Sequence, residues 1–353
     1  MLKYKNSFIQ NIYYMLCYAF KVLQQTNYEE VESESFDNIY DLFAEILIKG
    51  LNKQLKQGLH KEYVEKHKNL ATIRGKVNLR DSLANKMQRK QLLVCEYDEL
   101  SEDNSLNQIL KVTMILLLKE PSVKKEKKAK MRKLMLYFAN ISIINPRQIK
   151  WQNLQFQRNN QTYRMLINIC KFIIDGLLLS TEAGTYKTPT FSDENIEMLF
   201  ERFVLEYYKY HYPHLKVHRP HVKWNLVGED FNEGMTFLPQ MKTDIKLSYQ
   251  EKSLIIDTKF YGQILSDFEK YKSINLYQIF SYVKNEDVNR TGNVSGMLLY
   301  AKTDETKNIE YSFNMDGNRI GVRTLDLGQE FIGIKGQLDG IVGEYFGLEL
   351  YLK

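Results

Sequence analysis

The stretch that most constrains the fold lies at residues 239–261, where an apolar run leads directly into charged residues. Leu254-Ile255-Ile256 is typical of a buried strand, and the partial alternation of apolar and polar residues over 241–249 predicts a second strand before it. The polar residues 250–253 between them predict a hairpin turn. The sequence therefore predicts two paired strands, the second of which ends in Asp257 and Lys259.

Asp257 and Lys259 are two residues apart, so on a strand they point to the same face, while Thr258 points to the other. If the hairpin brings Asp244 alongside, two carboxylates and one ammonium converge. Neighbouring carboxylates repel each other unless a cation lies between them, and oxygen ligands favour Mg²⁺. A lysine beside that ion can orient or deprotonate a water that attacks a phosphodiester. The pattern predicts a metal-dependent DNA nuclease; a surface hairpin with solvated ion pairs is the alternative.

The composition is that of a globular protein with room for two or three domains. The chain has 353 residues, of which 44% are hydrophobic and 26% charged, and its net charge of +6 suits an anionic partner without requiring one. Cys17, Cys95 and Cys170 provide neither a disulfide framework nor a zinc spacing. Because no signal peptide and no apolar run of about 18 residues is found, we expect a cytoplasmic protein without a membrane partner.

The first half of the chain is dominated by helical patterns, and a polar stretch containing glycine and proline at residues 180–189 predicts a domain boundary. We expect a mainly helical domain with some strands over 1–185. Over 186–353 we expect an α/β domain with a central mixed sheet flanked by helices. The predicted helices of the first half span residues 8–23, 41–55, 108–118, a basic stretch from 124 to 138, and 163–179.

Two helices of the second half carry further candidate site residues. The first spans residues 192–208, with Met198, Leu199, Phe203 and Tyr207 predicted to point inward. Glu201 lies near the border of that apolar face. It is a candidate metal ligand, with a surface ion pair to a neighbouring cation as the alternative.

The second of these helices includes residues 275–283. Gln278 and Tyr282 lie four residues apart and share one of its faces. They are positioned either to hold a phosphate or base near the metal, or to cap the sheet from the side.

Three clusters of charged or metal-ligating residues have two interpretations each. The basic run 124–133 is the solvated face of a helix or a contact for the DNA backbone. The acidic segment 98–103 positions a helix that Asp103 or Ser105 caps, or forms a second metal site. The four histidines between residues 211 and 221 are interrupted by prolines, so we favour a polar loop and strand over structural zinc.

Motifs along nearly the whole chain resemble the McrC family, the nuclease subunits of McrBC-type modification-dependent restriction systems. The matching segments are residues 10–19, 73–77, 97–103, 106–107, 170–173, 238–245, 256–261, 275–278 and 327–330. They occur in both halves of the chain and in the order expected for the family.

The resemblance implies that the second half is a PD-(D/E)xK restriction-endonuclease-like domain. The acidic pair and the lysine of that motif then correspond to Asp244, Asp257 and Lys259, which hold Mg²⁺ and activate water, with the Thr258 carbonyl as an extra ligand. Related nucleases add a helical glutamate and a Gln-x-x-x-Tyr element, which correspond here to Glu201 and to Gln278 with Tyr282. One departure is that Pro239 lies five positions before Asp244 rather than directly before it.

The resemblance also implies that the first half is a stalk that docks into the hexameric ring of an McrB-like AAA+ GTPase and stimulates GTP hydrolysis. This chain has no Walker A pattern, so GTP is expected to be bound by the partner. Arg74 and residues 97–107 are candidates for the stimulating residues. The implied substrate is double-stranded DNA with a methylcytosine-type modification that the partner recognises.

Two alternatives remain beside this function. The first is a non-catalytic adaptor that docks on the AAA+ GTPase and activates it. The second is a stand-alone metal-dependent nuclease that needs neither the partner nor GTP.

Overall fold

The computed structural model describes residues 6–19, 38–156, 161–182, 193–226, 233–260, 271–302 and 308–348. The chain forms two compact units: residues 40–190 make up one, and residues 1–39 join residues 191–353 in the other. Among the described helices, none combines the length and apolarity needed to cross a bilayer.

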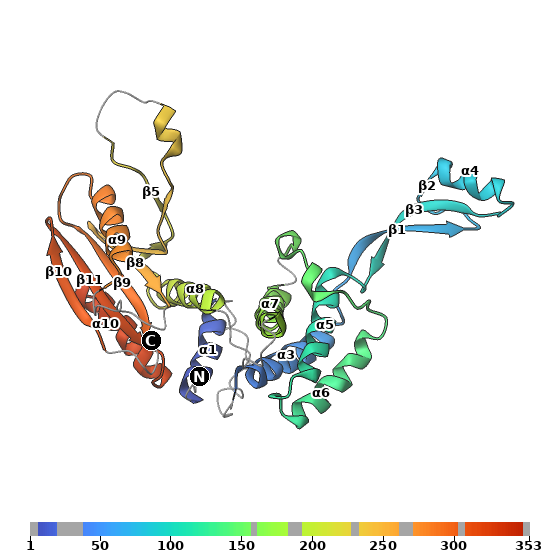
Figure 1. The fold of residues 1–353 in the computed structure, drawn as a ribbon, viewed down its shortest axis with the longest axis horizontal. Coiled ribbons are helices and arrows are strands. Elements are labelled where there is room, and N and C mark those ends of the chain that lie inside the picture. The colour runs from blue at the N-terminus through green and yellow to red at the C-terminus, as the bar shows by residue number, and fades with distance from the viewer. Residues whose placement is uncertain are drawn as a thin grey trace. The chain divides into compact units, whose positions relative to one another are not determined.

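The unit of residues 40–190 is built on helices, with a small antiparallel sheet that extends from them (Figure 1). Its larger helices are α3 (Ile39–Leu55), α5 (Ser105–Lys119), α6 (Lys125–Met135) and α7 (Gln161–Glu182). They confirm the helices predicted from the apolar periodicity and from the basic stretch. The expected cap of α5 is wrong, because Asn104, rather than Asp103 or Ser105, is the N-cap residue and accepts a hydrogen bond from the Asn107 amide.

The extended part of this unit, which we call the ribbon, comprises β1 (Glu62–Leu70), β2 (Lys76–Val77), α4 (Leu79–Met87) and β3 (Leu93–Ser101). The strand order is β1-β3-β2, and all pairs are antiparallel. Gly75 has a φ of +68°, and a Cβ there would lie 2.3 Å from the Glu96 carbonyl oxygen. Glycine is therefore required at this turn, where the backbone of residue 75 lies directly against strand β3.

The other unit contains a six-stranded mixed sheet, which confirms the central sheet predicted for the second half of the chain. Its strand order is β10-β11-β9-β8-β7-β4, with β8, β9 and β11 parallel. The strands are β4 (Lys216–His218), β7 (Ile245–Tyr249), β8 (Lys252–Lys259), β9 (Val294–Lys302), β10 (Glu310–Met315) and β11 (Asn318–Asp326). The predicted hairpin is formed by β7 and β8, whose turn lies at residues 250–251.

Helices α9 (Ser273–Glu286) and α10 (Phe331–Phe346) cover opposite faces of this sheet. A Cβ on Gly296 would meet Ile279 of α9, while a Cβ on Gly321 would meet Tyr345 of α10. Gly321 pairs with the residue after Gly296, so the two glycines face opposite sides. Side chains of β8 at Ile255, and by alternation at Asp257, therefore point to the α9 side.

Helix α1 (Asn6–Ala19) packs on α8 (Asp193–His211), so the amino-terminal helix belongs with the second half of the chain. The Asn11 side-chain amide donates hydrogen bonds to the carbonyls of Leu327 and Gln329, at 2.8 and 2.7 Å. The division at 185/186 remains a prediction of functional organisation, and residues 183–192 lie outside the described residues. The compact units divide nearby, at 190/191, but they place α1 with the sheet.

The apolar face predicted for α8 is correct for Leu199, Phe203 and Tyr207, which are buried. Met198 was predicted to point inward, but it is 48% exposed. Phe200, which was not among the predicted residues, is buried, so the inward face includes Phe200 rather than Met198 and otherwise agrees with the predicted one.

Candidate active site

Asp244 is held at the mouth of the β7–β8 hairpin by Thr258. The residue after Asp244 pairs with Ile256, and this register brings the carboxylate next to the end of β8. The Thr258 amide nitrogen donates a hydrogen bond to Asp244 Oδ2 at 2.8 Å, and the Thr258 hydroxyl donates a second one to the same atom at 3.1 Å. The predicted convergence of Asp244 with the end of the second strand is therefore present.

Asp257 and Lys259 form an ion pair across one face of β8, as their spacing predicts. Lys259 Nζ lies 2.8 Å from Asp257 Oδ2, and Asp257 is 1% exposed. Burial raises the pKa of the Asp257 carboxyl to about 6, the Lys259 ammonium opposes this shift, and the negative charges of Asp244 and Glu197 add to it. The site thus places the buried carboxylate of Asp257 near two other negative charges, and a bound cation would relieve their repulsion.

The two carboxylates provide oxygen ligands of the kind that Mg²⁺ prefers. Among the residues that the structure describes, no group of three or more His, Cys, Asp or Glu side chains is placed to share a metal ion. Mg²⁺ is commonly held by one or two carboxylates, with water and substrate phosphate as the other ligands. Asp244 and Asp257 meet that requirement. The Thr258 carbonyl as an extra ligand stays a prediction.

Helix α8 places two glutamates four residues apart. Glu201 forms an ion pair with Arg219, and its side chain is 17% exposed. Glu197, which was not among the candidates predicted from the sequence, contributes to the pKa of Asp257. Glu201 as a metal ligand stays a prediction, and Glu197 is a second candidate from the same helix. The spacing of i and i+4 was the signal that could have included it.

Gln278 and Tyr282 are neighbours on α9, as predicted. Gln278 Nε2 donates a hydrogen bond to the Tyr282 hydroxyl at 2.9 Å, and that hydroxyl donates to the Lys242 carbonyl at 3.0 Å. Burial raises the pKa of Tyr282, and the charges of Asp257 and Asp244 raise it further. The pair therefore lies within electrostatic reach of the carboxylates and is tied to the strand that leads into Asp244.

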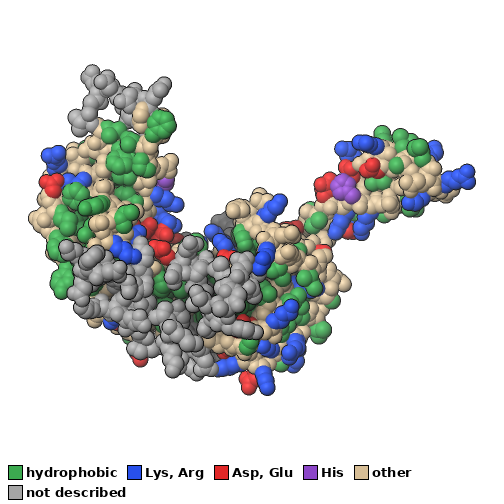
Figure 2. Space-filling model, viewed as in Figure 1, with side chains coloured by type: hydrophobic (Ala, Val, Ile, Leu, Met, Phe, Trp, Pro, Cys, Tyr) green, Lys and Arg blue, Asp and Glu red, His purple; other side chains and the backbone are tan. Residues whose placement is uncertain are grey.

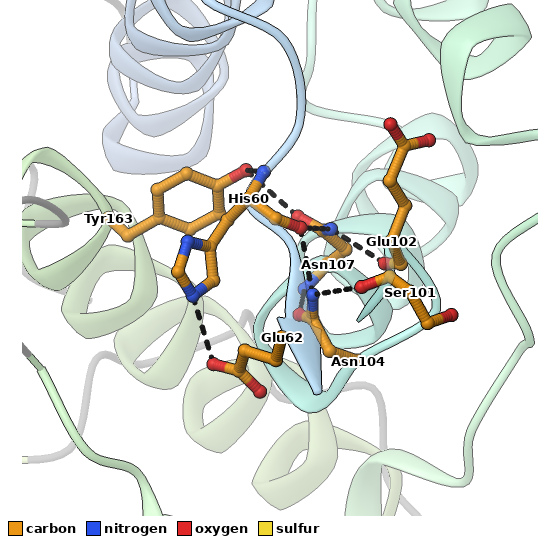
Figure 3. A network of polar contacts seen from close by, with 7 residues as sticks. All are labelled: His60, Glu62, Ser101, Glu102, Asn104, Asn107 and Tyr163. Carbon is orange, nitrogen blue, oxygen red and sulfur yellow. Dashed lines mark hydrogen bonds and ion pairs between the residues drawn. The ribbon is translucent and has the colours of Figure 1, made fainter. Parts of the chain in front are cut away.

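The segment 97–107, a candidate for contact with the partner, comprises the end of β3 and the root of the ribbon, and Figure 3 shows Ser101, Glu102, Asn104 and Asn107 at this root. Asn107 is fully buried and donates to the carbonyls of His60 and Glu102, at 2.8 and 2.7 Å. Tyr163 donates to Asn107 Oδ1 at 2.9 Å and accepts from the His60 amide at 2.8 Å. The Asn104 side-chain amide also donates a hydrogen bond to the His60 carbonyl, at 2.8 Å. Asn107 therefore fixes the start of β1 and the end of β3 to α5 and α7.

Arg74 lies at the turn before β2. Its guanidinium lies 4.1 Å from the centre of the Tyr97 ring and 3.5 Å from Glu99 Oε1, and its side chain is 53% exposed. Both contacts are on β3 of the same ribbon. Arg74 is therefore held in place while part of its side chain faces solvent.

The basic run is not solvated throughout. Lys127 is 7% exposed and lies 2.9 Å from Asp41 Oδ2, so it anchors α6 to α3. The histidines also have separate surroundings. His211 is the last residue of α8, and its Nε2 forms a hydrogen bond with the Tyr18 hydroxyl at 2.7 Å. His218 and His221 lie on different strands, β4 and β5. These positions agree with the interpretation of a polar loop and strand.

A family model described as "McrBC 5-methylcytosine restriction system component" matches residues 3–301. The chain belongs to this family. Within the McrBC family, the chain is 28% identical over 342 residues to the Type IV methyl-directed restriction enzyme EcoKMcrBC of Escherichia coli K12. That alignment covers 96% of this chain and 97% of the relative.

Two solved structures of McrBC assemblies are also similar. A half-complex from a tetradecameric assembly of Thermococcus gammatolerans McrB AAA+ hexamers with bound McrC matches with a TM-score of 0.50. It is 20% identical, and the match covers 95% of this chain and 76% of that one. The cryo-EM structure of the T. gammatolerans McrBC complex matches with a TM-score of 0.39, at 24% identity and 56% coverage of each chain. The first match shows a shared fold for this member of the McrBC family.

Proposed function

We propose that this chain is the DNA-cleaving subunit of a GTP-dependent, modification-dependent restriction complex, and that its sheet-containing unit is a PD-(D/E)xK endonuclease domain. The observation that carries the proposal is the convergence of Asp244, Asp257 and Lys259 at one end of the β7–β8 hairpin. A buried carboxylate with a raised pKa and a specific charged partner is typical of a functional site rather than of a solvated hairpin. Membership of the McrBC family and the name of the E. coli relative support DNA as the substrate.

In the proposed reaction, Asp244 and Asp257 would hold Mg²⁺, which when bound would stabilise, as a Lewis acid, the charge that develops on the phosphate. Lys259 holds and orients the attacking water, and its ammonium also keeps Asp257 ionised at neutral pH. Thr258 fixes the position of Asp244. Gln278 and Tyr282 are assigned to a phosphate or base of the DNA, and Glu201 or Glu197 would be a further ligand of the metal.

The proposed partner is an McrB-like AAA+ GTPase, because the structural relative has McrC bound to McrB AAA+ hexamers. The ribbon offers a surface for it, with large apolar side chains that are more than half exposed. These are Tyr63, Ile73, Leu79, Leu83, Met87 and Leu100. Exposed apolar side chains gathered on one extension are typical of an interaction surface. We assign docking and stimulation of GTP hydrolysis to this ribbon, with Arg74 as the candidate stimulating residue.

Substitution of one carboxylate tests the proposal. The complex of the Asp244→Asn variant with its partner should bind DNA and hydrolyse GTP as the wild type does, but should cut DNA at least ~100-fold more slowly. Cleavage at the wild-type rate would show that this carboxylate is not part of the active site.

A further inference from the structure

A protruding arm leads directly into the candidate active site. It contains β5 (His221–Val222), the 3₁₀ helix η5 (Glu233–Phe237) and β6 (Met241–Lys242), and we call it the β5–β6 arm. Figure 1 shows it extending beyond the edge of the six-stranded sheet of its unit. Lys242 is two residues before Asp244, so the arm and the carboxylate share one short piece of backbone.

The root of the arm is firmly anchored. Val222 and Met241 pair with each other, and both are buried in the core cluster that includes Ile279 and Tyr282 of α9. The amide and the hydroxyl of Thr243 both donate to the Pro220 carbonyl, at 3.2 and 3.0 Å. The root of the arm is therefore held in a fixed position next to the candidate active site.

Further out, the two sides of the arm are joined to each other by one hydrogen bond, and a second hydrogen bond joins the arm to α9. The Trp224 indole donates to the Pro239 carbonyl at 2.8 Å, and the Asn225 amide donates to Asn285 Oδ1 of α9, also at 2.8 Å. Beyond these bonds the surface becomes apolar. Phe237 is 84% exposed, and Leu226 and Leu238 are 49% and 37% exposed. Figure 2 shows hydrophobic side chains at this end of the arm.

The arm also carries cations that the described residues leave uncompensated. His221 and Lys242 are directly opposite each other on its exposed face, and Lys223 follows on the same side of β5. Neither Lys223 nor Lys242 forms an ion pair within the described part of the chain. By contrast, Lys246 and Arg219 nearby are paired, with Glu286 and Glu201 respectively. Free lysines beside an apolar tip complement DNA, since lysine is depleted in the cores of protein–protein interfaces.

We propose that the β5–β6 arm is a DNA-binding element, in which Lys223 and Lys242 bind backbone phosphates and Phe237 inserts into a groove of the duplex. Apolar side chains inserted at a base step bend the duplex and fix its register. Because β6 continues into Asp244, the insertion sets which phosphate reaches Asp244 and Asp257. The proposal rests on the proposed nuclease function and adds how the substrate is held.

Site-specific photocrosslinking tests the proposal in the full chain assembled with its AAA+ partner. A benzophenone amino acid replaces Phe237 in one variant and the exposed Phe313 of β10 in a matched control. Each complex is irradiated with a labelled methylated duplex in Ca²⁺, which replaces Mg²⁺ so that the DNA stays intact. The crosslink yield over a protein titration gives the apparent affinity, which is measured at several salt concentrations with and without Lys223→Ala and Lys242→Ala.

The expected result is a DNA crosslink from position 237 and none from position 313. Removing both lysines should reduce the slope of log affinity against log salt by about 2, because each lysine neutralises one phosphate. A crosslink from position 237 to the partner or to a second copy of this chain, or no crosslink at all, overturns the proposal. If the slope of log affinity against log salt is unchanged, Lys223 and Lys242 do not bind phosphates, and that part of the proposal is wrong.

Cleavage of the same duplex in Mg²⁺ separates the two proposals. If cleavage depends on Asp257 but position 237 does not crosslink to DNA, the arm is wrongly assigned and the nuclease function stands. If position 237 crosslinks to DNA but Asp257→Ala still cleaves, the arm binds DNA and the active site lies elsewhere.

Discussion

Thr258 donates two hydrogen bonds to one oxygen of Asp244, one from its amide at 2.8 Å and one from its hydroxyl at 3.1 Å. Only the second depends on the side chain. Thr258→Val should therefore keep Asp244 near its position and reduce DNA cleavage by a modest factor of about 5, which corresponds to about 1 kcal/mol for one hydrogen bond. Thr258→Ser retains the hydroxyl and should cleave like the wild type. A loss as large as that of an Asp244 variant would show that the backbone bond does not suffice.

Because the Asp257 carboxyl is buried, replacing it with a neutral amide should stabilise the protein, and the gain should depend on pH. Its pKa of about 6 in the folded state lies above the ordinary 3.8, so ionised Asp257 opposes folding. Asp257→Asn should raise the free energy of unfolding by about 1–3 kcal/mol at pH 8. The gain should shrink as the pH falls through 6, and vanish near 4, where the wild-type carboxyl is protonated in both states.

Urea unfolding of wild type and Asp257→Asn at pH 8 and pH 5, without metal, measures this difference. Asp326→Asn is the control, because Asp326 is a partly exposed carboxylate of the same sheet that is paired with Lys302 at 2.9 Å. Equal stability of Asp257→Asn and wild type at pH 8 would contradict the burial argument.

The affinity for Mg²⁺ should depend on whether the Asp257 carboxyl is ionised. Below pH 6 a proton competes with the metal at Asp257, so the affinity should fall by about tenfold per pH unit, while above pH 7 it should be constant. The negative charge of Glu197 raises the pKa of Asp257. Glu197→Gln should therefore move the midpoint of this pH dependence downward, and Glu201→Gln, which releases Arg219, should leave it in place.

Calorimetric titration of Mg²⁺ between pH 5 and pH 8 gives the midpoints of wild type, Glu197→Gln and Glu201→Gln. A shift caused by Glu201→Gln but not by Glu197→Gln would restore Glu201 as the glutamate that acts on the site.

The polar network at the root of the ribbon predicts a local stability effect. Asn107→Leu keeps a similar volume but leaves the Glu102 carbonyl and the Tyr163 hydroxyl without this partner. Unfolding of the 40–190 unit should become easier by about 2–4 kcal/mol, because buried polar groups lose their bonds. Asn168→Ala removes a bond within one helix, to the Arg164 carbonyl, and should change stability by less than about 0.5 kcal/mol. Thermal unfolding of the three proteins measures this, and similar midpoints would contradict it.

Local patterns were sufficient to predict the elements that carry the candidate site. The apolar run before Asp257 predicted β8, the period-2 rule placed Asp257 and Lys259 on one face, and the helical period placed Gln278 beside Tyr282. These relations depend on neighbours within a few residues, so the sequence contains them directly. The convergence of Asp244 with the end of β8 was expected if the hairpin formed, because a hairpin turn fixes the register, but the hydrogen bonds from Thr258 to Asp244 were not predicted.

Relations between distant segments were not predictable in this way. The Asn11 side chain donates hydrogen bonds to carbonyls more than 300 positions away in the sequence. Likewise, no local pattern indicates that α1 packs on α8. Lys127 belongs to a run predicted to be solvated or to contact DNA, but it is buried because α3 supplies Asp41 as its partner. The short strands β5 and β6 contain two residues each, too few for any periodicity, so the arm that leads into Asp244 was missed.

The central claim is that this chain cuts modified DNA with Asp257 and Lys259, and plasmid cleavage tests it most directly. Methylated and unmethylated plasmids are incubated with this protein, its McrB-like partner, GTP and Mg²⁺, using wild type, Asp257→Ala and Lys259→Ala in parallel. The account predicts that only wild type cuts, that only methylated plasmid is cut, and that all three proteins stimulate GTP hydrolysis equally. Cleavage by the variants at the wild-type rate would contradict it, and stimulation without any cleavage by the wild type would identify an adaptor instead.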